Sequence, residues 1–221
     1  MTEADVLHED NHIIIVNKRA GQVVQIDESG DTPLCEIVQA FLKKKHKKEG
    51  NVFLGVTHRL DRPVSGVIIF AKTSKALTRL NKMFQEKEIQ KTYWAFCLAN
   101  PAKASDLLTH YLVKDRRKNK TKAHNKKVTE GKFSQLEYKE IKRSGRQSLL
   151  EVNPLTGRPH QIRVQLASIG CIIKGDLKYG APKANEDKSI CLHSRRVRFI
   201  HPVSKEEIDL EAPLHRPGLW K

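Results

Sequence analysis

A carboxylate with an arginine on each side stands directly before an apolar run in the first third of the chain. Asp61 lies between Arg59 and Arg62, Pro63 adds a turn signal, and residues 67–71 read Val-Ile-Ile-Phe-Ala. An apolar run bounded by turn signals predicts a strand buried on both faces, so Asp61 is expected in a loop held by a rigid element. Such loops concentrate catalytic residues, and an ionised aspartate can act as a nucleophile or base. An ordinary ion pair between Asp61 and a neighbouring arginine fits the local pattern equally well.

A second dense polar segment spans residues 156–166 and reads Thr-Gly-Arg-Pro-His-Gln-Ile-Arg-Val-Gln-Leu. Ile162, Leu166 and Ile169 recur at helical spacing, and Gly170 stands where a helix would end. We therefore predict a turn that leads into a helix, although the alternation within this segment also suits a strand. On such a helix, Arg163 would ordinarily be a surface residue.

Residues 91–98 read Lys-Thr-Tyr-Trp-Ala-Phe-Cys-Leu, which predicts a strand rich in aromatic residues. Tyr93 could face a functional site, or it could belong to the core with Trp94 and Phe96. Strand periodicity alone does not decide between these two positions.

The strongest compositional feature of the 221 residues is a formal charge of +16, with a pI near 9.8. An excess of cations at this level favours a polyanionic partner, because neutralising phosphates releases condensed counterions. A highly solvated surface without such a partner is the alternative. The most basic segment, residues 114–127, is expected to be an exposed loop or hairpin tip that grips an RNA backbone, through Lys114, Arg116, Arg117, Lys118, Lys120, Lys122, Lys126 and Lys127.

Several classes of protein are disfavoured by the same sequence. The acidic N-terminal stretch lacks the apolar region of a signal peptide, and no apolar run is long enough to span a bilayer. The widely spaced cysteines at positions 35, 97, 171 and 191 are expected to be reduced and mostly buried. His8 and His12 have i, i+4 spacing without a third ligand nearby, so no metal site is predicted. We expect a cytoplasmic protein.

The remaining pattern predicts an α+β fold with much antiparallel sheet in a single domain, residues 1–221. The expected elements are a hairpin over 10–24, helices over 32–46 and 74–87, consecutive strands over 133–141 and 149–152, a strand over 191–200 and a short strand near 208–210.

Several of these segments together resemble the RluA-type RNA pseudouridine synthases, which convert uridine within RNA into pseudouridine. In chain order they are Val16-Asn17-Lys18-Arg19-Ala20-Gly21, His58-Arg59-Leu60-Asp61 with Ser65-Gly66, Lys91-Thr92-Tyr93, residues 156–163, Gly175-Asp176 with Tyr179-Gly180, and Leu192-His193 with His201-Pro202. The chain departs from the family at Val64, usually Thr, at Arg19, usually Pro, and at Gln165, often His. These departures concern the substrate and fine detail rather than the chemistry.

The resemblance implies one pseudouridine synthase catalytic domain, with a largely antiparallel mixed β-sheet flanked by helices and loops. The first motif begins almost at Met1, so the S4-type RNA-binding domain that many relatives carry is not expected. No cofactor is implied, because the reaction is an isomerisation. The implied partner is structured RNA, ribosomal or transfer, and a monomer without an obligate protein partner is expected.

The resemblance also implies roles for individual residues. Asp61 would attack the sugar or remove its 2′ proton, Tyr93 would stack on the target base, and Arg163 would favour the ionised form of Asp61. Arg59 would help to hold the flipped nucleotide. Further RNA contacts are expected from Arg62, Arg158 and His160, while His58, His160 and Asp176 are expected to be structural or orienting rather than catalytic.

Two other functions compete with this one. A non-catalytic RNA-binding protein that has kept the fold would have no reason to retain the aspartate, tyrosine and arginine together. A metal-dependent nuclease that uses Asp61 and Asp176 is disfavoured, because the groups beside Asp61 are cationic rather than acidic.

Overall fold

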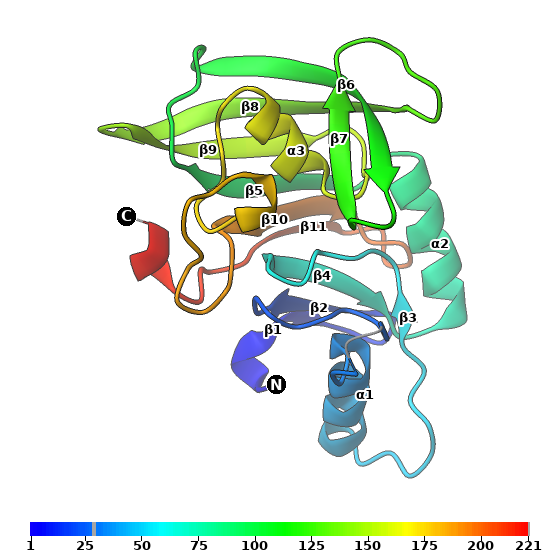
Figure 1. The fold of residues 1–221 in the computed structure, drawn as a ribbon. Coiled ribbons are helices and arrows are strands. Elements are labelled where there is room, and N and C mark those ends of the chain that lie inside the picture. Colours follow the sequence, from blue (N-terminus) through cyan, green and yellow to red (C-terminus); the bar gives the residue numbers. More distant parts are fainter. Residues whose placement is uncertain (28–29, 221) are drawn as a thin grey trace. The chain divides into compact units, whose positions relative to one another are not determined.

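The computed structural model describes residues 1–27 and 30–220, which form two compact units. The first unit comprises residues 1–90 with 194–215, and the second comprises residues 91–193 with the C-terminal residues from Arg216. Each unit is described by itself (Figure 1).

The first unit has an antiparallel sheet with a short 3₁₀ helix before it and two α-helices. Its elements are η1 (Glu3–Asp5), β1 (Val6–Glu9), β2 (Ile13–Lys18), α1 (Leu34–Lys45), β3 (Gly55–Val56), β4 (Ser65–Ala71), α2 (Ser74–Gln85), β10 (Leu192–Ile200) and β11 (Glu207–Glu211). Strand β2 pairs with β1 and β4, β3 pairs with one end of β4, and β11 pairs with β10.

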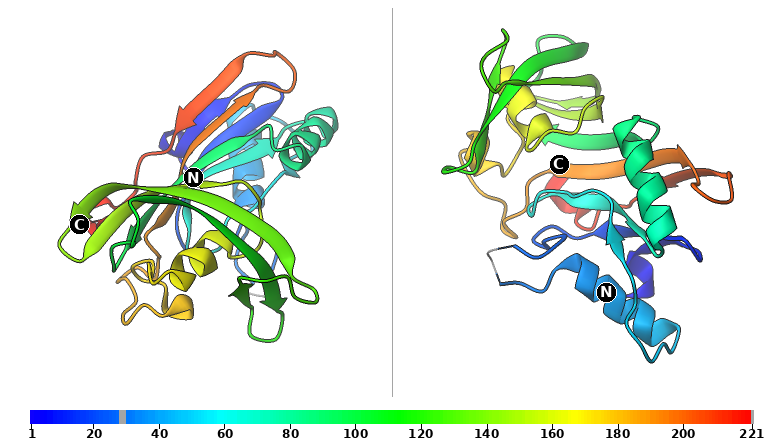
Figure 2. Two further views of the ribbon diagram at one scale, coloured as in Figure 1. Left: turned by 90° about the horizontal axis from the view of Figure 1, so that it is seen from above. Right: turned by 90° about the vertical axis from the view of Figure 1, so that its right-hand side faces the viewer.

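The core of the first unit lies between this sheet and α2. Ile15 of β2 and Val67 and Ile69 of β4 pack against Ala76 and Leu80 of α2. The helix lies alongside these strands in Figures 1 and 2. Six of the seven residues of β4 are buried, so the predicted strand buried on both faces is confirmed. Asp61 precedes it in a loop, as expected.

The second unit has a meandering antiparallel sheet in the order β5-β9-β8-β6-β7. Its elements are β5 (Gln90–Cys97), β6 (Ser105–Asp115), β7 (Lys120–His124), β8 (Lys132–Ser144), β9 (Gln147–Pro154), α3 (Gln161–Ser168), η2 (Leu177–Tyr179) and η3 (Pro217–Trp220). Helix α3 packs on one face of β6 and β7, where Val164 and Ala167 contact Leu112 and Ala123. The predicted turn into a helix is confirmed, and the strand alternative is wrong.

The α+β class and the largely antiparallel sheet are confirmed, but the predicted hairpin over residues 10–24 is wrong. Strand β2 pairs with β1, which precedes it, and Val23 and Val24 form no strand. The reason is a side chain: Asp10 Oδ1 accepts hydrogen bonds from the backbone nitrogens of His12 (2.6 Å) and Ile13 (2.8 Å) and closes the turn there. The carbonyl of Val23 instead accepts from the nitrogen of Leu34 at the start of α1 (2.7 Å).

All four cysteines are free thiols, and three are buried, as predicted. Among the described residues, we find no helix with both the length and the apolar character that a bilayer crossing requires.

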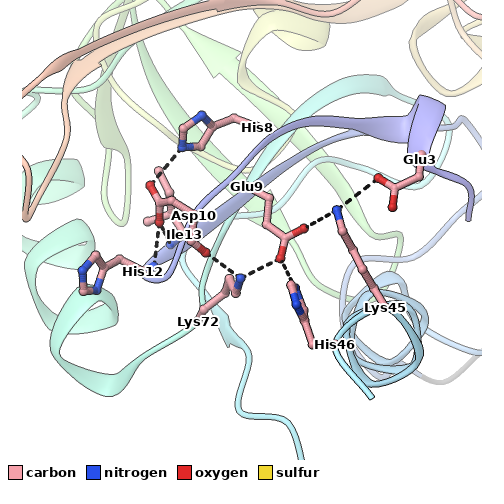
Figure 3. A network of polar contacts seen from close by, with 9 residues as sticks. All are labelled: Glu3, His8, Glu9, Asp10, His12, Ile13, Lys45, His46 and Lys72. Atoms are coloured by element: carbon pink, nitrogen blue, oxygen red, sulfur yellow. Dashed lines mark hydrogen bonds and ion pairs between the residues drawn. The ribbon is translucent and has the colours of Figure 1, made fainter. Parts of the chain in front are cut away.

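A network around Glu9 joins the end of β1 to α1 and to the end of β4 (Figure 3). The carboxylate, 9% exposed, accepts from Lys72 Nζ (2.7 Å) and Lys45 Nζ (2.9 Å) and lies 2.6 Å from His46 Nε2. Burial alone would raise the pKa of Glu9, but these hydrogen bonds outweigh it and lower the pKa to about 2. The ionised form of Glu9 therefore stabilises the first unit.

We expect the substitution Glu9→Gln to lower the free energy of unfolding at neutral pH by about 3 kcal/mol, the value of this pKa shift. A carboxyl group with a lowered pKa stabilises above its unfolded pKa near 4.5, and this contribution is lost as the pH falls toward 2. When urea unfolding is measured from pH 7 down to pH 3, the free energies of unfolding of the wild type and of Glu9→Gln should therefore converge. As the control, Glu207→Gln removes an exposed ion pair with Arg198 and should cost much less. A difference in free energy of unfolding between the wild type and Glu9→Gln that stays constant with pH would contradict this role of Glu9.

Candidate active site

The loop that carries Asp61 is held by backbone hydrogen bonds to the end of β2 and the residues after it. The nitrogen of Val64 donates to the carbonyl of Asp61 (3.0 Å), which closes a turn. The carbonyl of Arg62 accepts from the nitrogen of Gly21 (2.8 Å) and from Lys18 Nζ (3.2 Å). The backbone at Asp61 and Arg62 is therefore held in place by these bonds.

Gly66 explains why β4 begins where it does. Its φ is +113°, and a Cβ built there would lie 2.3 Å from the carbonyl oxygen of Ser194 in β10. A side chain at this position would force the two backbones apart. Glycine at position 66, five residues after Asp61, thus permits the close approach of β4 to β10.

Lys18 is a fully buried lysine at the end of β2, with 0% exposure. Its ammonium donates to the carbonyls of Gln22 (2.8 Å), Arg19 (3.0 Å) and Arg62 (3.2 Å). Burial lowers the pKa of Lys18 to about 7, the Asp61 carboxylate opposes this lowering, and Arg62 adds to it. A buried cation thus attracts the Asp61 carboxylate from within the same unit.

In the second unit, Arg163 of α3 is 5% exposed and forms a bidentate ion pair. Its Nε donates to Asp176 Oδ2 (2.7 Å), and its Nη2 donates to Asp176 Oδ1 (2.8 Å). The guanidinium carbon lies 5.1 Å from the centre of the Tyr179 ring. Asp176 and Tyr179 therefore fix the plane of the guanidinium, which supports the orienting role expected for Asp176.

Tyr179 connects Arg163 to the basic hairpin. Its hydroxyl accepts from the backbone nitrogen of Thr121 in β7 (2.9 Å) and lies 2.9 Å from Nδ1 of His160. His160 adopts a left-handed conformation (φ 56°) directly before α3. Lys120 Nζ lies 5.4 Å from the centre of the same ring. One side chain thus joins the hairpin, the turn before α3 and Arg163.

Tyr93 lies in the middle of β5 opposite Val152, and only 8% of it is exposed. Its neighbour Trp94 lies opposite Glu151 and is half-buried. The alternation puts the two rings on opposite faces of the strand. Tyr93 therefore projects to the face of the sheet that also carries the buried residues of β9.

The basic segment forms the β6–β7 hairpin, as predicted. Asp115 Oδ1 accepts from the nitrogen of Lys118 (3.0 Å) and stabilises the turn. The cationic residues of this segment are exposed except for Lys120, which is half-buried against Tyr179. Of the other residues expected to contact RNA, Arg59, Arg62 and Arg158 are exposed, and Arg62 pairs with Asp31.

The structure thus brings Arg163, His160 and Lys120 together around Tyr179, and it brings Lys18 near Asp61. Asp61 belongs to the first unit, whereas Tyr93 and Arg163 belong to the second, so the pairing of Asp61 with Arg163 stays a prediction. Sequence reasoning assigned no role to Lys18 or Tyr179. For Lys18 a signal existed, because a lysine that continues the run Ile-Ile-Ile-Val-Asn is unusual in a buried strand.

Comparison with known proteins adds an independent observation. The family model described as RNA pseudouridylate synthase matches residues 12–168. Ribosomal large subunit pseudouridine synthase C of Vibrio cholerae is 28% identical over 215 residues, which are 95% of this chain and 65% of that protein. An uncharacterised RNA pseudouridine synthase of Bacillus subtilis is 33% identical over 215 residues, covering 96% and 68%. The chain therefore spans about two thirds of the length of these relatives.

Solved structures show the same fold. Human RNA pseudouridylate synthase domain containing 4 superimposes with a TM-score of 0.82 at 22% identity, over 99% of this chain and 93% of that one. Human RNA pseudouridylate synthase domain containing 1 gives 0.76 at 20% identity. At sequence identities of 22% and 20%, the similarity to these two structures shows a shared fold.

The buried ammonium predicts a distinctive pH dependence of stability. Lys18 titrates near 7 in the folded protein but at 10.5 when unperturbed, so the unfolded chain binds an extra proton between these values. The free energy of unfolding should therefore rise with pH in this range, by at most about 1.4 kcal/mol per pH unit. The variant Lys18→Met lacks this contribution.

Urea unfolding at several pH values from 6.5 to 9.5 tests this expectation, with wild type gaining stability relative to Lys18→Met as the pH rises. Other titrating groups are common to both proteins and cancel in the difference. An NMR titration of the Lys18 side chain in the wild type gives a second measurement. A midpoint near the unperturbed value would contradict the burial argument.

Proposed function

The chain belongs to the RNA pseudouridylate synthase family, and we propose that it isomerises specific uridines within RNA to pseudouridine. The observation that carries the proposal is the family match over residues 12–168, which includes the loop of Asp61, strand β5 with Tyr93, and Arg163 of α3. Ribosomal RNA is the first substrate to test, because the curated relatives include proteins named for the large ribosomal subunit. Transfer RNA is the second.

The reaction breaks the N1–C1′ bond of uridine, turns the base and forms a C5–C1′ bond. The C5 proton is lost and N1 gains a proton, so atoms and electrons balance without an oxidant or an energy source. A carboxylate near C1′ or the 2′ carbon is the group required from the protein. Asp61 fills this role in the proposal, by covalent attack on the sugar or by removal of the 2′ proton.

Arg163 is the proposed partner of Asp61, as the family resemblance implies. The bidentate pair with Asp176 uses two of its five N–H groups, and an arginine held in this way keeps its donor directions fixed. Lys18 supplies a second cation to the carboxylate from within the first unit.

Tyr93 is the proposed stacking partner of the target base. A uridine within a helix or stacked loop cannot be reached in place, so the nucleotide must be extruded at a cost of roughly a few kcal/mol. Arg59, which is exposed and lies two positions before Asp61, is the residue proposed to hold that nucleotide or to fill the gap that it leaves.

One observation counts against the nuclease alternative. Both oxygens of Asp176 accept hydrogen bonds from Arg163, and Asp176 is 1% exposed, so its carboxylate is engaged by a cation in its own unit. A metal ligand would need these oxygens. The alternative of a non-catalytic RNA-binding protein is distinguished from an enzyme by the tritium-release assay.

Release of tritium from C5-labelled uridine in RNA tests the activity and Asp61 together. We expect release from ribosomal or transfer RNA transcripts in the presence of EDTA, and a loss of at least about a thousand-fold in Asp61→Asn, because the carboxylate is the reacting group. As the matched control, Asp209→Asn removes a surface partner of Arg196 and should release tritium like the wild type. RNA cleavage, or equal release from Asp61→Asn, would refute the assignment.

The basic hairpin should contribute to affinity through charge rather than sequence. Replacing Arg116, Arg117 and Lys118 with Gln should weaken RNA binding and lower the slope of log Kd against log salt by about 2, since each phosphate contact adds about 0.7 to 0.9. The control replaces Lys43, Lys44 and Lys48, which are equally exposed at the end of α1, and should leave the slope nearly unchanged. An unchanged slope in the hairpin variant would show that the hairpin does not contact RNA.

A further inference from the structure

The sheet of the second unit has one face that α3 covers and another that it leaves open. On β6, Leu108, His110 and Leu112 are buried on the α3 face, while the alternate residues Leu107 and Thr109 are exposed. Leu107 of β6 and Phe133 of β8 are exposed and lie on the open face. Toward the hairpin turn, that face carries a row of two aromatic side chains and a histidine.

Three rings occupy one cross-strand row on the open face. Phe133 of β8 lies opposite Tyr111 of β6, and Tyr111 lies opposite His124 of β7. The rings of Tyr111 and Phe133 meet edge to face with centroids 5.9 Å apart. Phe133 is 43% exposed, and the other two side chains are half-buried. Residues directly opposite in antiparallel strands share a face, so the three side chains form one row on the open face, here called the platform.

Cationic side chains surround this platform. Lys122, one row nearer the hairpin turn, is exposed on the same face opposite Val113. Arg158 is exposed and donates from Nε to the carbonyl of Phe133 (3.3 Å).

The platform is also close to the basic turn of the hairpin. Tyr111 lies four residues before Asp115, where β6 ends, which corresponds to about 13 Å along the strand. A nucleic-acid strand held at the turn can therefore reach the rings without leaving the hairpin.

We propose that the row Phe133-Tyr111-His124 is a stacking platform for an unpaired base of the RNA, next to the phosphate contacts of the β6–β7 hairpin. The inference rests on the proposed function, because it takes RNA as the ligand. Aromatic side chains that alternate with cations are the features that bind single-stranded nucleic acid, the rings taking bases and the cations taking phosphates. The target uridine is assigned to Tyr93, so this platform takes a second nucleotide.

The charge around the rings decides between RNA and a protein partner. Lys122 lies beside His124 on this face, and Arg158 donates to the carbonyl of Phe133, so cations stand where the phosphates next to a stacked base would lie. Leu107 provides the internal comparison: it is 47% exposed on the same face of β6 but lies opposite Glu137.

The test measures binding of a fluorescein-labelled single-stranded oligouridylate by anisotropy at several salt concentrations. We expect Phe133→Ala to weaken binding on the order of ten-fold, the loss typical of one stacked base. The salt slope should stay unchanged, because no phosphate contact is removed. Phe133→Leu should weaken binding similarly although it keeps most of the apolar area, and Phe133→Trp should restore it. Leu107→Ala is the matched control and should bind like the wild type.

Photo-crosslinking of a 5-bromouridine oligonucleotide to the unmodified protein gives a second measurement, with the adduct expected on a peptide containing Tyr111 or Phe133. Wild-type affinity in Phe133→Ala, or an adduct found elsewhere only, would overturn the platform. So would a wild-type dimer that Phe133→Ala dissociates, since the row would then bind a second copy. Failure of the proposed function is distinct: the wild type would bind the oligonucleotide but release no tritium from any RNA.

Discussion

The burial of the Lys18 ammonium is the constraint on which the geometry of the first unit depends. A buried cation is costly unless its donors are satisfied, and here the acceptors are three backbone carbonyls, at residues 19, 22 and 62. These carbonyls come from two segments about forty positions apart in the chain. Satisfying one ammonium therefore locks the loop of Asp61 to the end of β2. The close approach at Gly66 then fixes where β4 begins relative to β10.

The second unit also buries a cation, and there the partner is a side chain rather than backbone carbonyls. Arg163 is buried against Asp176, and such a pair is tolerated only when its geometry is good and the remaining donors are engaged. Tyr179 packs against the guanidinium and also accepts from Thr121 of the hairpin. Tyr179 thus connects the β6–β7 hairpin, the proposed RNA-binding segment, to the guanidinium of Arg163. A movement of β7 on RNA binding would reach Arg163 through the Tyr179 ring.

Periodicity predicted the elements that bury one face or both. The run at 67–71, the turn into α3 and a helix over 74–87 follow from apolar spacing, and the structure confirms them, with the helix at Ser74–Gln85. The hairpin over 10–24 was wrong, because the side chain of Asp10 closes an earlier turn that spacing does not reveal. Lys18 and Tyr179 were missed for a different reason. Their importance depends on carbonyls and hydroxyl contacts between distant segments, which no local pattern encodes. The roles of Asp61, Tyr93 and Arg163 came from the family resemblance, since local patterns left each of them open.

The two RNA contacts proposed on the second unit, with phosphates and with an unpaired base, suggest how one uridine among many would be selected. The phosphate contacts proposed for the hairpin would position an RNA but would carry no sequence information. Stacking on the open face is also tolerant of base identity, but it requires a base that is unpaired. Together they would favour RNA in which an unpaired nucleotide lies a fixed distance from the strand held at the hairpin. Selection would then depend on the shape of the RNA, and the chemistry at Asp61 would act on the uridine that this shape presents.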